Sequence, residues 1–434
     1  ATSSAPCSNA RGHLEGAVAV EKTMDAVVFG WVVHTASTVV WLESDSGHIY
    51  SLDGAYRQFR QDVHDVVGQN FTHGSGEAGF AIHLHGLKPG SKVQLKAICE
   101  SGVHVLTEVQ FTALPIDPVG ASRVLFGIGG AVGDLHRRFP LVDAPILAPL
   151  IEHHREVLAE LPVTGKQLGE AVSQPMVSVI VPLYGRTDFV EHQLIEFAED
   201  PWFRSHVELI YVLDDPSLVE GFISEAAFLH KLYRLPFSWV WGSVNRGFSG
   251  ANNLGASRAR GEYLVFLNSD AFPQTAGWLE ALVHVLATQP DIGAVAPRLV
   301  FADGSIQHAG MEFMRRDELG IWVNHHPLMG LDPGLDRHRE AAVVPAVTGG
   351  CLAMRHTDFE HVGGWDTGYL MGDFEDSDLC LKLCAEGLKS AYLPTVQLTH
   401  LERQSFKLLG HDQFSSRVVI YNAVRHQERW AEQI

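Results

Sequence analysis

The sequence predicts an α/β protein in which a mostly parallel sheet, flanked by helices, follows an all-β domain. Two observations support this fold class. In residues 1–115, short β-branched or alternating runs, such as 26–33 and 79–85, are separated by turn residues, the pattern of a small antiparallel β-sandwich. From Met176 onward, strand-like and helix-like segments alternate, and residues 177–184 are almost continuously apolar, as expected for a strand covered on both faces.

The composition is that of an ordinary globular protein. The 434 residues suggest two or three domains. The 32 Lys+Arg and 51 Asp+Glu give a formal net charge of −19, which argues against general binding of nucleic acid, because that requires basic residues to neutralise phosphates. No apolar run reaches the roughly 18–20 residues that span a bilayer, and no secretory leader is visible. We therefore expect no transmembrane segment and at most a peripheral contact with a membrane.

The local sequence pattern divides the chain into four segments. We expect a β-sandwich accessory domain in residues 1–115, a helical connector in 116–174, an α/β catalytic domain in 175–403 and a C-terminal helical segment in 404–434. The glycine-rich stretch 127–133 resembles a dinucleotide-binding loop, but its last glycine lies one position late. We interpret it as part of the connector.

The cysteines are odd in number and widely scattered: Cys7, Cys99, Cys351, Cys380 and Cys384. This usage shows no disulfide framework and favours reduced thiols, which are typical of cytosolic proteins. We therefore expect a cytoplasmic location, compatible with the inner face of a membrane.

Polar residues follow three strands of the predicted sheet, where open α/β sheets bind ligands. Pro182 and Tyr184 end the first strand, Asp214 and Asp215 follow the second, and Asn-Ser-Asp at 268–270 follows the third. Two carboxylate clusters at neighbouring strand ends repel each other unless a positive charge lies between them. A divalent cation with a diphosphate ligand meets that need. The alternative is that each aspartate caps the next helix or turn.

A second acidic group opens a later helix. Glu375 and Asp376 lie in its predicted first turn, where the helix dipole favours carboxylates. The same placement holds an ionised carboxylate at the helix end, as a general base requires. His400 follows a predicted strand, and it is either a ligand or a structural histidine.

An ordered series of motifs is similar to the family-2 glycosyltransferases of the GT-A fold, and to their rhamnosyltransferase-like bacterial members. The resemblance covers 176–403, with every block in the family's order. The blocks are 179–184 (VIVPLY), 213–217 (LDDPS), 245–255 (NRGFSGANNLG), 261–270 (GEYLVFLNSD), 348–351 (TGGC), 363–366 (GGWD), 374–380 (FEDSDLC) and 399–400 (TH).

The resemblance implies roles for individual residues. A nucleotide-diphospho-sugar would be bound by Pro182, Tyr184, Asp214, Asp215, Arg246, Gly247 and Asn268. A divalent cation, Mg²⁺ or Mn²⁺, would be held by Asp270 and His400, with Asn268 standing where many members carry aspartate. The wall of the acceptor site would contain Gly349, Gly350 and Trp365, although a buried tryptophan is equally compatible with the core.

The implied reaction is an inverting transfer with Asp376 as the base and Glu375 as the second choice. The donor would be a UDP-, dTDP- or GDP-linked sugar. The acceptor would be a glycan or lipid-linked hydroxyl, in the synthesis of polysaccharide or cell-surface glycan. A homo-oligomer or a larger multidomain enzyme is compatible with the sequence.

Two other functions stay open at this point. A sugar nucleotidyltransferase needs a glycine-rich, lysine-containing phosphate loop after the first strand, but residues 181–186 offer one glycine and no lysine. A non-catalytic carbohydrate-binding or scaffold protein, with the first domain as its working part, would be indifferent to the substitution Asp376→Asn.

Overall fold

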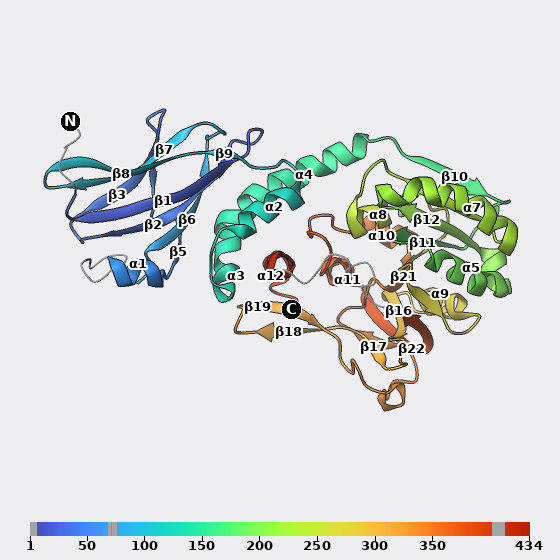
Figure 1. Cartoon of the computed structure of the whole chain (residues 1–434). Helices are drawn as coiled ribbons and strands as arrows, with labels where there is room; N and C mark the ends of the chain where they lie inside the picture. Colours follow the sequence, from blue (N-terminus) through green and yellow to red (C-terminus); the bar gives the residue numbers. More distant parts are fainter. Residues whose placement is uncertain (1–6, 68–70, 72–75, 402–412) are drawn as a thin grey trace. The chain divides into compact units, whose positions relative to one another are not determined.

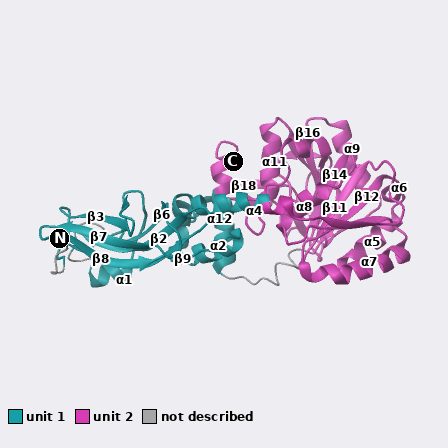
Figure 2. Cartoon of the chain, turned by 90° about the horizontal axis from the view of Figure 1, so that it is seen from above, with its two compact units in different colours: residues 1–156, 317–321, 413–424 teal, residues 157–316, 322–412, 425–434 magenta. Residues whose placement is uncertain are grey.

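The computed structural model describes residues 7–67, 71, 76–401 and 413–434 (Figure 1). The chain divides into two compact units (Figure 2). Unit 1 comprises residues 1–156, 317–321 and 413–424, and unit 2 comprises 157–316, 322–412 and 425–434. The predicted domain boundaries remain predictions, and residues 402–412 of the predicted C-terminal segments lie outside the described part of the chain.

Unit 1 begins with a β-sandwich of two sheets. One sheet has the order β5-β6-β2-β1-β9, and the other has the order β4-β3-β7-β8. The strands are β1 (Ala10–Ala19), β2 (Asp25–His34), β3 (Val39–Ser44), β4 (Ile49–Ser51), β5 (Tyr56–Gln58), β6 (Gly79–His85), β7 (Lys92–Cys99), β8 (Gly102–Gln110) and β9 (Thr112–Ala113), with helix α1 (Gln61–Val66) between β5 and β6.

The inner faces of the two sheets form one apolar core. Leu14, Val28 and Phe80 from the first sheet share a buried cluster with Leu42 and Leu95 from the second. The alternation of buried and more exposed residues along β7 follows from the two-residue period of a strand. The predicted all-β domain is therefore confirmed.

Helices follow the sandwich in unit 1. They are α2 (Pro118–Gly127), η2 (Val132–Asp134), α3 (Leu135–Arg138), η3 (Phe139–Asp143) and α4 (Ala144–Glu160). Asp117 caps α2 by accepting a hydrogen bond from Gly120 N, and Pro118 takes the first helical position, which needs no N–H donor. The buried Arg138 guanidinium donates to the carbonyls of Leu125 and Ile128 and to Asp143, so it satisfies the end of α2.

Unit 2 contains an eleven-stranded sheet with the main order β10-β13-β12-β11-β14-β21-β16-β22-β15. The run β13-β12-β11-β14 is parallel, as is the pair β16-β22. The strands are β10 (Thr164–Leu168), β11 (Val177–Leu183), β12 (Val207–Leu213), β13 (Phe237–Trp241), β14 (Tyr263–Leu267), β15 (Ala271–Pro273), β16 (Ile292–Val300), β17 (Ile306–His308), β20 (Ala342–Val344), β21 (Cys351–Arg355) and β22 (Lys389–His400).

Helices cover both faces of this sheet, as the predicted α/β fold class requires. Val179 and Val181 of β11 point into one core, and Ile180 between them points into another. The first core is completed by helices α5 (Phe189–Glu199), α6 (Pro201–His206), α7 (Val219–Tyr233) and α9 (Trp278–Thr288). The second is completed by α8 (Gly247–Ala256), α10 (His356–His361) and α11 (Glu375–Ala385). The fold class is confirmed.

Some elements differ from the sequence-based expectation. Strand β10 lies within the predicted helical connector, yet it pairs antiparallel with β13 at the edge of the sheet. Its residues are mostly exposed, so they lack the apolar pattern that identifies a buried strand. The remaining elements are η4 (Pro216–Leu218), η5 (Pro333–Leu335), the hairpin β18 (Glu312–Arg316) and β19 (Ile321–His325), and the C-terminal helix α12 (Gln413–Trp430).

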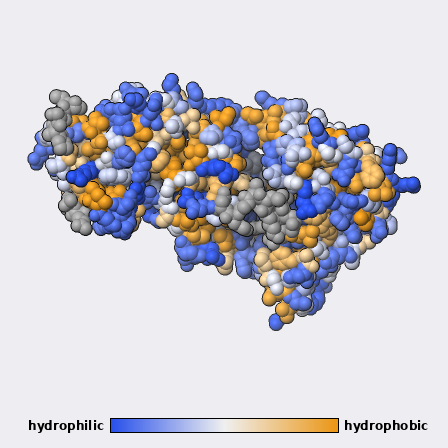
Figure 3. All heavy atoms as spheres, in the orientation of Figure 1, coloured by the Kyte–Doolittle hydropathy of each residue, from blue (hydrophilic) through white to orange (hydrophobic). Residues whose placement is uncertain are grey.

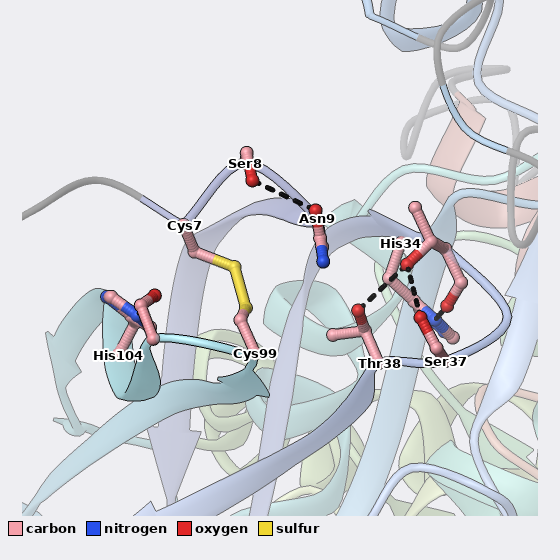
Figure 4. Close-up of a disulfide and its surroundings, with 10 residues drawn as sticks. Cys7, Ser8, Asn9, His34, Ser37, Thr38, Cys99 and His104 are labelled. Atoms are coloured by element: carbon pink, nitrogen blue, oxygen red, sulfur yellow. Dashed lines mark hydrogen bonds between the residues drawn. A yellow bond between two sulfur atoms is a disulfide. The ribbon is translucent and has the colours of Figure 1, made fainter.

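The expectation that all cysteines are reduced is wrong for two of them. Cys7 and Cys99 form a disulfide that joins the segment before β1 to the end of β7 (Figure 4). The 92 residues between them hid the pairing in the sequence, because only the sandwich brings the two positions together. Since disulfides persist in oxidising compartments, cysteine usage no longer supports a cytosolic location.

None of the helices in the described part of the chain has both the length and the apolar content to cross a bilayer. On the face seen in Figure 3, hydrophilic and hydrophobic side chains are interspersed.

Removing the disulfide should destabilise the sandwich. Replacing Cys7 and Cys99 with serine frees a long loop in the unfolded chain, so the free energy of unfolding of this domain should fall by about 2–4 kcal/mol. Urea unfolding followed by circular dichroism measures the change. The matched control is Cys384→Ser, which alters an exposed free thiol. Equal unfolding midpoints for the double variant and the control would contradict the prediction.

Candidate active site

Backbone hydrogen bonds of two consecutive glycines link the predicted base, Asp376, to Asn268, which adjoins the predicted cation ligands. Gly349 N donates to Asp376 Oδ2 at 3.1 Å, and Asn268 N donates to the carbonyl oxygen of Gly350 at 3.0 Å. The two glycines immediately precede β21, which runs antiparallel to β14, so the start of one strand meets the end of the other. Residues that are 108 positions apart in the sequence, Asn268 and Asp376, therefore contact the backbone of adjacent residues.

Gly349 is also where three side chains converge. A Cβ atom on Gly349 would lie 3.2 Å from the Phe248 ring, 3.2 Å from the Trp365 ring and 3.4 Å from the Asp376 Cβ. Phe248 follows Gly247 at the start of α8, so the predicted nucleotide loop reaches the same point. A glycine is required here because its missing side chain permits this close approach.

The predicted nucleotide-binding residues meet at the ends of β11 and β12. Asp214 N donates to the Leu183 carbonyl, and Asp214 Oδ1 accepts the Arg246 backbone N–H at 2.6 Å. Asp215 accepts from Ser217 N and from Gly185 N, so it caps η4 and fixes the loop after β11. The alternative that these aspartates cap local turns is therefore true of Asp215, whose Oδ1 and Oδ2 are both engaged.

The other residues predicted to bind the nucleotide lie in different environments. Pro182 is partly exposed, and Tyr184 is 38% exposed at the end of the same strand. The Arg246 guanidinium donates to the Gly242 carbonyl, so its charge supports the backbone of this loop. Gly247 has φ of +69°, which only glycine adopts without strain.

The cation set is compact. His400 Nε2 lies 3.1 Å from Asp270 Oδ1 and 3.1 Å from Asn268 Nδ2. β15 pairs with the end of β22, with Ala271 opposite His400, which places Asp270 beside the histidine. All three side chains that sequence reasoning assigned to this region are thus brought together.

Gln307 completes this set, and sequence reasoning missed it. Its Oε1 lies 2.6 Å from His400 Nδ1, and because an amide oxygen only accepts, Nδ1 carries the proton. His400 Nε2, the other ring nitrogen, then faces Asp270. Gln307 is the middle residue of the three-residue strand β17, Ile306-Gln307-His308, whose short mixed sequence carries no pattern that marks it as part of a site.

The residues present fit a divalent cation that is shared with a substrate. Within the described ranges, no three His, Cys, Asp or Glu side chains gather closely enough to hold a metal ion by themselves. Asp270 and His400 supply a carboxylate oxygen and a ring nitrogen, with the Asn268 amide adjacent. Mg²⁺ is commonly bound by one or two carboxylates together with substrate phosphates, so this incomplete set suits a cation bound with a diphosphate.

The two acids of α11 differ in exposure. Asp376 is partly exposed, whereas Glu375 is 7% exposed and its Oε2 has no hydrogen-bond partner in the described structure. Burial raises the pKa of Asp376, despite the N–H groups of Gly349 and Ser377 that favour its charged form. Burial and the charges of Asp376 and Asp373 raise the pKa of Glu375 well above its usual value. Of the two acids, Glu375 is therefore the one whose protonated form is favoured more strongly.

The backbone before α11 is strained. Met371, Asp373 and Phe374 have φ of +60°, +78° and +72°, and Gly372 between them has φ of +111°. Each such non-glycine residue costs of order 1–3 kcal/mol, and strain of this kind concentrates at functional sites. The turn delivers Asp376 to the first turn of the helix.

A buried network holds α11 in place. Asp378 accepts hydrogen bonds from Tyr369 Oη at 3.0 Å and from Trp430 Nε1 at 2.8 Å, and it pairs with Arg429 at 3.0 Å. His426 Nε2 lies 3.1 Å from Ser377 Oγ, the neighbour of the predicted base. These contacts with the end of α12 therefore hold α11 in position.

Trp365 belongs to the apolar core, with 2% of its surface exposed. It meets the rings of Phe248 and Phe266 edge to face, and its backbone is held by Asn253. Only its edge approaches Gly349. Its predicted acceptor role stays a prediction, as do the acceptor roles of Gly349 and Gly350.

With this geometry established, the chain was compared with known proteins. Residues 178–363 match the family Glycosyl transferase family 2. This chain therefore contains a glycosyltransferase family 2 domain, and the predicted family is confirmed.

Three curated relatives are similar to this chain. The uncharacterized protein y4gI of Sinorhizobium fredii is 30% identical over 271 residues, covering 59% of this chain and 27% of that protein. The O-antigen biosynthesis protein RfbC of Myxococcus xanthus is 29% identical over 256 residues, covering 58% and 19%. The N-acetylglucosaminyl-diphospho-decaprenol L-rhamnosyltransferase of Mycobacterium tuberculosis is 27% identical over 166 residues, covering 36% and 53%. The chain thus spans about a fifth to a half of these relatives.

Among solved structures, GalNAc-T7 with UDP, GalNAc and Mn²⁺ aligns with a TM-score of 0.43 at 17% identity, covering 54% of this chain and 45% of that one.

Asp214 should make stability depend on pH. Burial raises the pKa of this carboxyl to about 7, so the folded protein holds a proton there that the unfolded chain releases. The resulting stability is present at low pH and is lost as the pH rises through 7. Between about pH 6 and pH 8, the free energy of unfolding should fall by about 1.4 kcal/mol more in the native protein than in Asp214→Asn. Urea titrations at both pH values measure this, and parallel pH dependences would refute it.

Proposed function

We propose that this chain is an inverting glycosyltransferase that moves a sugar from a nucleotide-diphospho-sugar to an acceptor hydroxyl. The observation that supports the proposal is that two adjacent glycines contact the two predicted sets of residues: Gly349 N donates to Asp376 Oδ2, and a Cβ on Gly350 would lie 3.5 Å from the His400 ring. A single displacement at an anomeric carbon needs a base close to the site that binds the diphosphate.

The proposed step is as follows. Asp376 takes the proton from the acceptor hydroxyl while that oxygen forms a bond to the anomeric carbon. The bond between the anomeric carbon and the diphosphate oxygen breaks, the nucleoside diphosphate leaves, and the configuration at the anomeric carbon inverts. A divalent cation bound by Asp270 and His400 supplies positive charge that stabilises the leaving diphosphate.

Glu375 has a different proposed role. Its burial and the nearby charge of Asp376 raise its pKa and favour its protonated form, which makes it a poorer base than Asp376. A protonated carboxyl avoids placing a second negative charge beside the first.

The donor and acceptor are proposed by class. Asp214, Arg246 and Gly247 form the loop that would face the nucleotide, and the ring of the next residue, Phe248, lies 3.2 Å from the position of a Cβ on Gly349. Two of the named relatives are an O-antigen biosynthesis protein and an N-acetylglucosaminyl-diphospho-decaprenol L-rhamnosyltransferase. We therefore propose a hexose or deoxyhexose donor linked to UDP, dTDP or GDP, and a glycan or lipid-linked acceptor of a bacterial surface polysaccharide.

The substitution Asp376→Asn tests the base directly. Transfer or donor hydrolysis should fall by about 10²–10⁴-fold, because the amide cannot accept the proton. Binding of the nucleoside diphosphate with Mn²⁺, measured by isothermal titration calorimetry, should be retained. Glu375→Gln is the matched control, since it preserves the neutral form of its neighbour, and its rate should stay close to that of the native protein. Equal rates for Asp376→Asn and the native protein would rule Asp376 out as the base.

Gln307 provides a test of the cation site. Replacing it with leucine removes the acceptor that orients His400, so Mn²⁺ affinity in the presence of nucleoside diphosphate should fall by about 10–100-fold. Gln274→Leu is the control, because Gln274 bonds to Thr399, next to His400, without contacting the histidine. The measurement is calorimetric titration with Mn²⁺. If both leucine variants bind the ion as tightly as the native protein, Gln307 does not support the site.

A further inference from the structure

The β-sandwich unit contains a cavity that the proposed reaction does not use. Its volume is about 360 Å³, and it is lined by residues from β1, β2, β5 and β6 together with the glycine-rich segment 128–131. Small-ligand pockets occupy roughly 300–1,000 Å³, so the cavity is at the lower end of that range. The sequence stretch that resembled a dinucleotide-binding loop thus forms one of its walls.

A β-bulge places a carboxylate at this cavity. The register of β1 against β2 shifts between Leu14 and Gly16, so Glu15 is an extra residue without a partner in the ladder. Bulges re-aim side chains and are over-represented next to functional sites. Glu15 pairs with Arg60 at 2.8 Å, and both residues line the cavity.

Aromatic rings supply the apolar part of the lining. Phe59 is 54% exposed, and Phe29 is partly exposed on β2. The Phe29 ring packs over Gly16, where an added Cβ would lie 2.5 Å from a ring carbon. The missing side chain at Gly16 therefore lets the Phe29 ring pack closely over the β1 backbone next to the bulge.

Two polar side chains in the lining lack partners. Gln58 is partly exposed, and its amide makes no hydrogen bond with the described residues; Gly79 opposite it on β6 leaves the room it occupies. Tyr56 is 2% exposed, and its hydroxyl is buried without a hydrogen-bond partner in the described structure. The partly exposed Gln58 amide is therefore the group that can exchange hydrogen bonds with a ligand that carries hydroxyl groups.

The charges of the lining select among ligand classes. Among the described residues that line the cavity, Glu15 and Arg60 are the charged ones, and the Arg60 guanidinium is compensated by Glu15 and by the neighbouring Asp62. A phosphate or carboxylate ligand needs uncompensated positive charge, which is lacking in this set. Paired Glu and Arg side chains, a free amide and aromatic rings instead offer donors, acceptors and an apolar surface to a neutral ligand.

We propose that this cavity binds a neutral sugar ring of a saccharide chain, separately from the transfer site. The C–H face of a pyranose packs on the rings of Phe29 and Phe59, since an aromatic face is electron-rich. The ring hydroxyls exchange hydrogen bonds with Gln58, Glu15 and Arg60. The β-sandwich unit is thereby a glycan-holding module.

Saturation-transfer difference NMR on the full chain tests this site. The probes are methyl α-L-rhamnopyranoside, N-acetylglucosamine and methyl β-D-glucopyranoside at millimolar concentration, with glucose 6-phosphate as the anionic comparison. The cavity variant is Gln58→Ala with Phe59→Ala. Its control is Phe228→Ala, which removes a 63% exposed phenylalanine from α7 in unit 2. Circular dichroism checks that each variant is folded, and Gln58→Ala alone replaces the double variant if that one is not.

At least one neutral sugar should give a signal that glucose 6-phosphate does not. The cavity variant should weaken its binding by about tenfold or more, and Phe228→Ala should leave it unchanged. The signal should persist in Asp376→Asn and with saturating nucleoside diphosphate and Mn²⁺, so it is independent of the proposed reaction. The proposal is overturned if no neutral sugar binds, if the cavity variant binds as well as the control, or if the nucleotide displaces the sugar.

Discussion

The hydrogen bond from Gly349 N to Asp376 Oδ2 is the contact on which the active site depends. The carbonyl oxygen of the next residue, Gly350, accepts the Asn268 N–H, so one short stretch of backbone holds both the proposed base and Asn268, beside the proposed cation ligands. Side chains at either glycine would obstruct this arrangement, since a Cβ on Gly350 would lie 3.0 Å from Leu299 and 3.5 Å from the His400 ring. The backbone junction between β14 and β21 therefore positions the charged residues of the proposed reaction.

Charge repulsion and backbone strain destabilise this junction, and buried contacts stabilise it. Two adjacent carboxyl groups begin α11, and the preceding residues occupy positive-φ conformations. The compensation comes from buried polar contacts further along the helix, where Asp378 is bonded to Tyr369 and Trp430. Removing one partner from such a buried network destabilises the folded protein more than removing one partner of an exposed surface pair does. We infer that the end of α12 is part of the catalytic architecture, although it lies 54 residues beyond Asp376 at Trp430.

Much of this could be predicted from the sequence, because local patterns encode it. Strands β11, β12 and β14 are continuous apolar runs, and the rule that ligands gather at their carboxyl ends singled out Asp214 and Asp270. What the sequence could not provide was long-range pairing. Gln307 meets His400 only because β17 pairs with β16, which in turn pairs with β22. Cys7 and Cys99 meet only through the sandwich, and β10 is an exposed edge strand whose partner, β13, lies about 70 residues away.

The central claim is that one carboxylate acts as a base beside the diphosphate site, with no nucleophile on the protein. The most direct measurement is the anomeric configuration of the first sugar released when the enzyme hydrolyses its donor in the presence of Mn²⁺, followed by proton NMR before mutarotation. A water molecule deprotonated by Asp376 attacks the anomeric carbon once, so the account predicts a sugar of configuration opposite to that of the donor. A first product that retains the donor's configuration would contradict it.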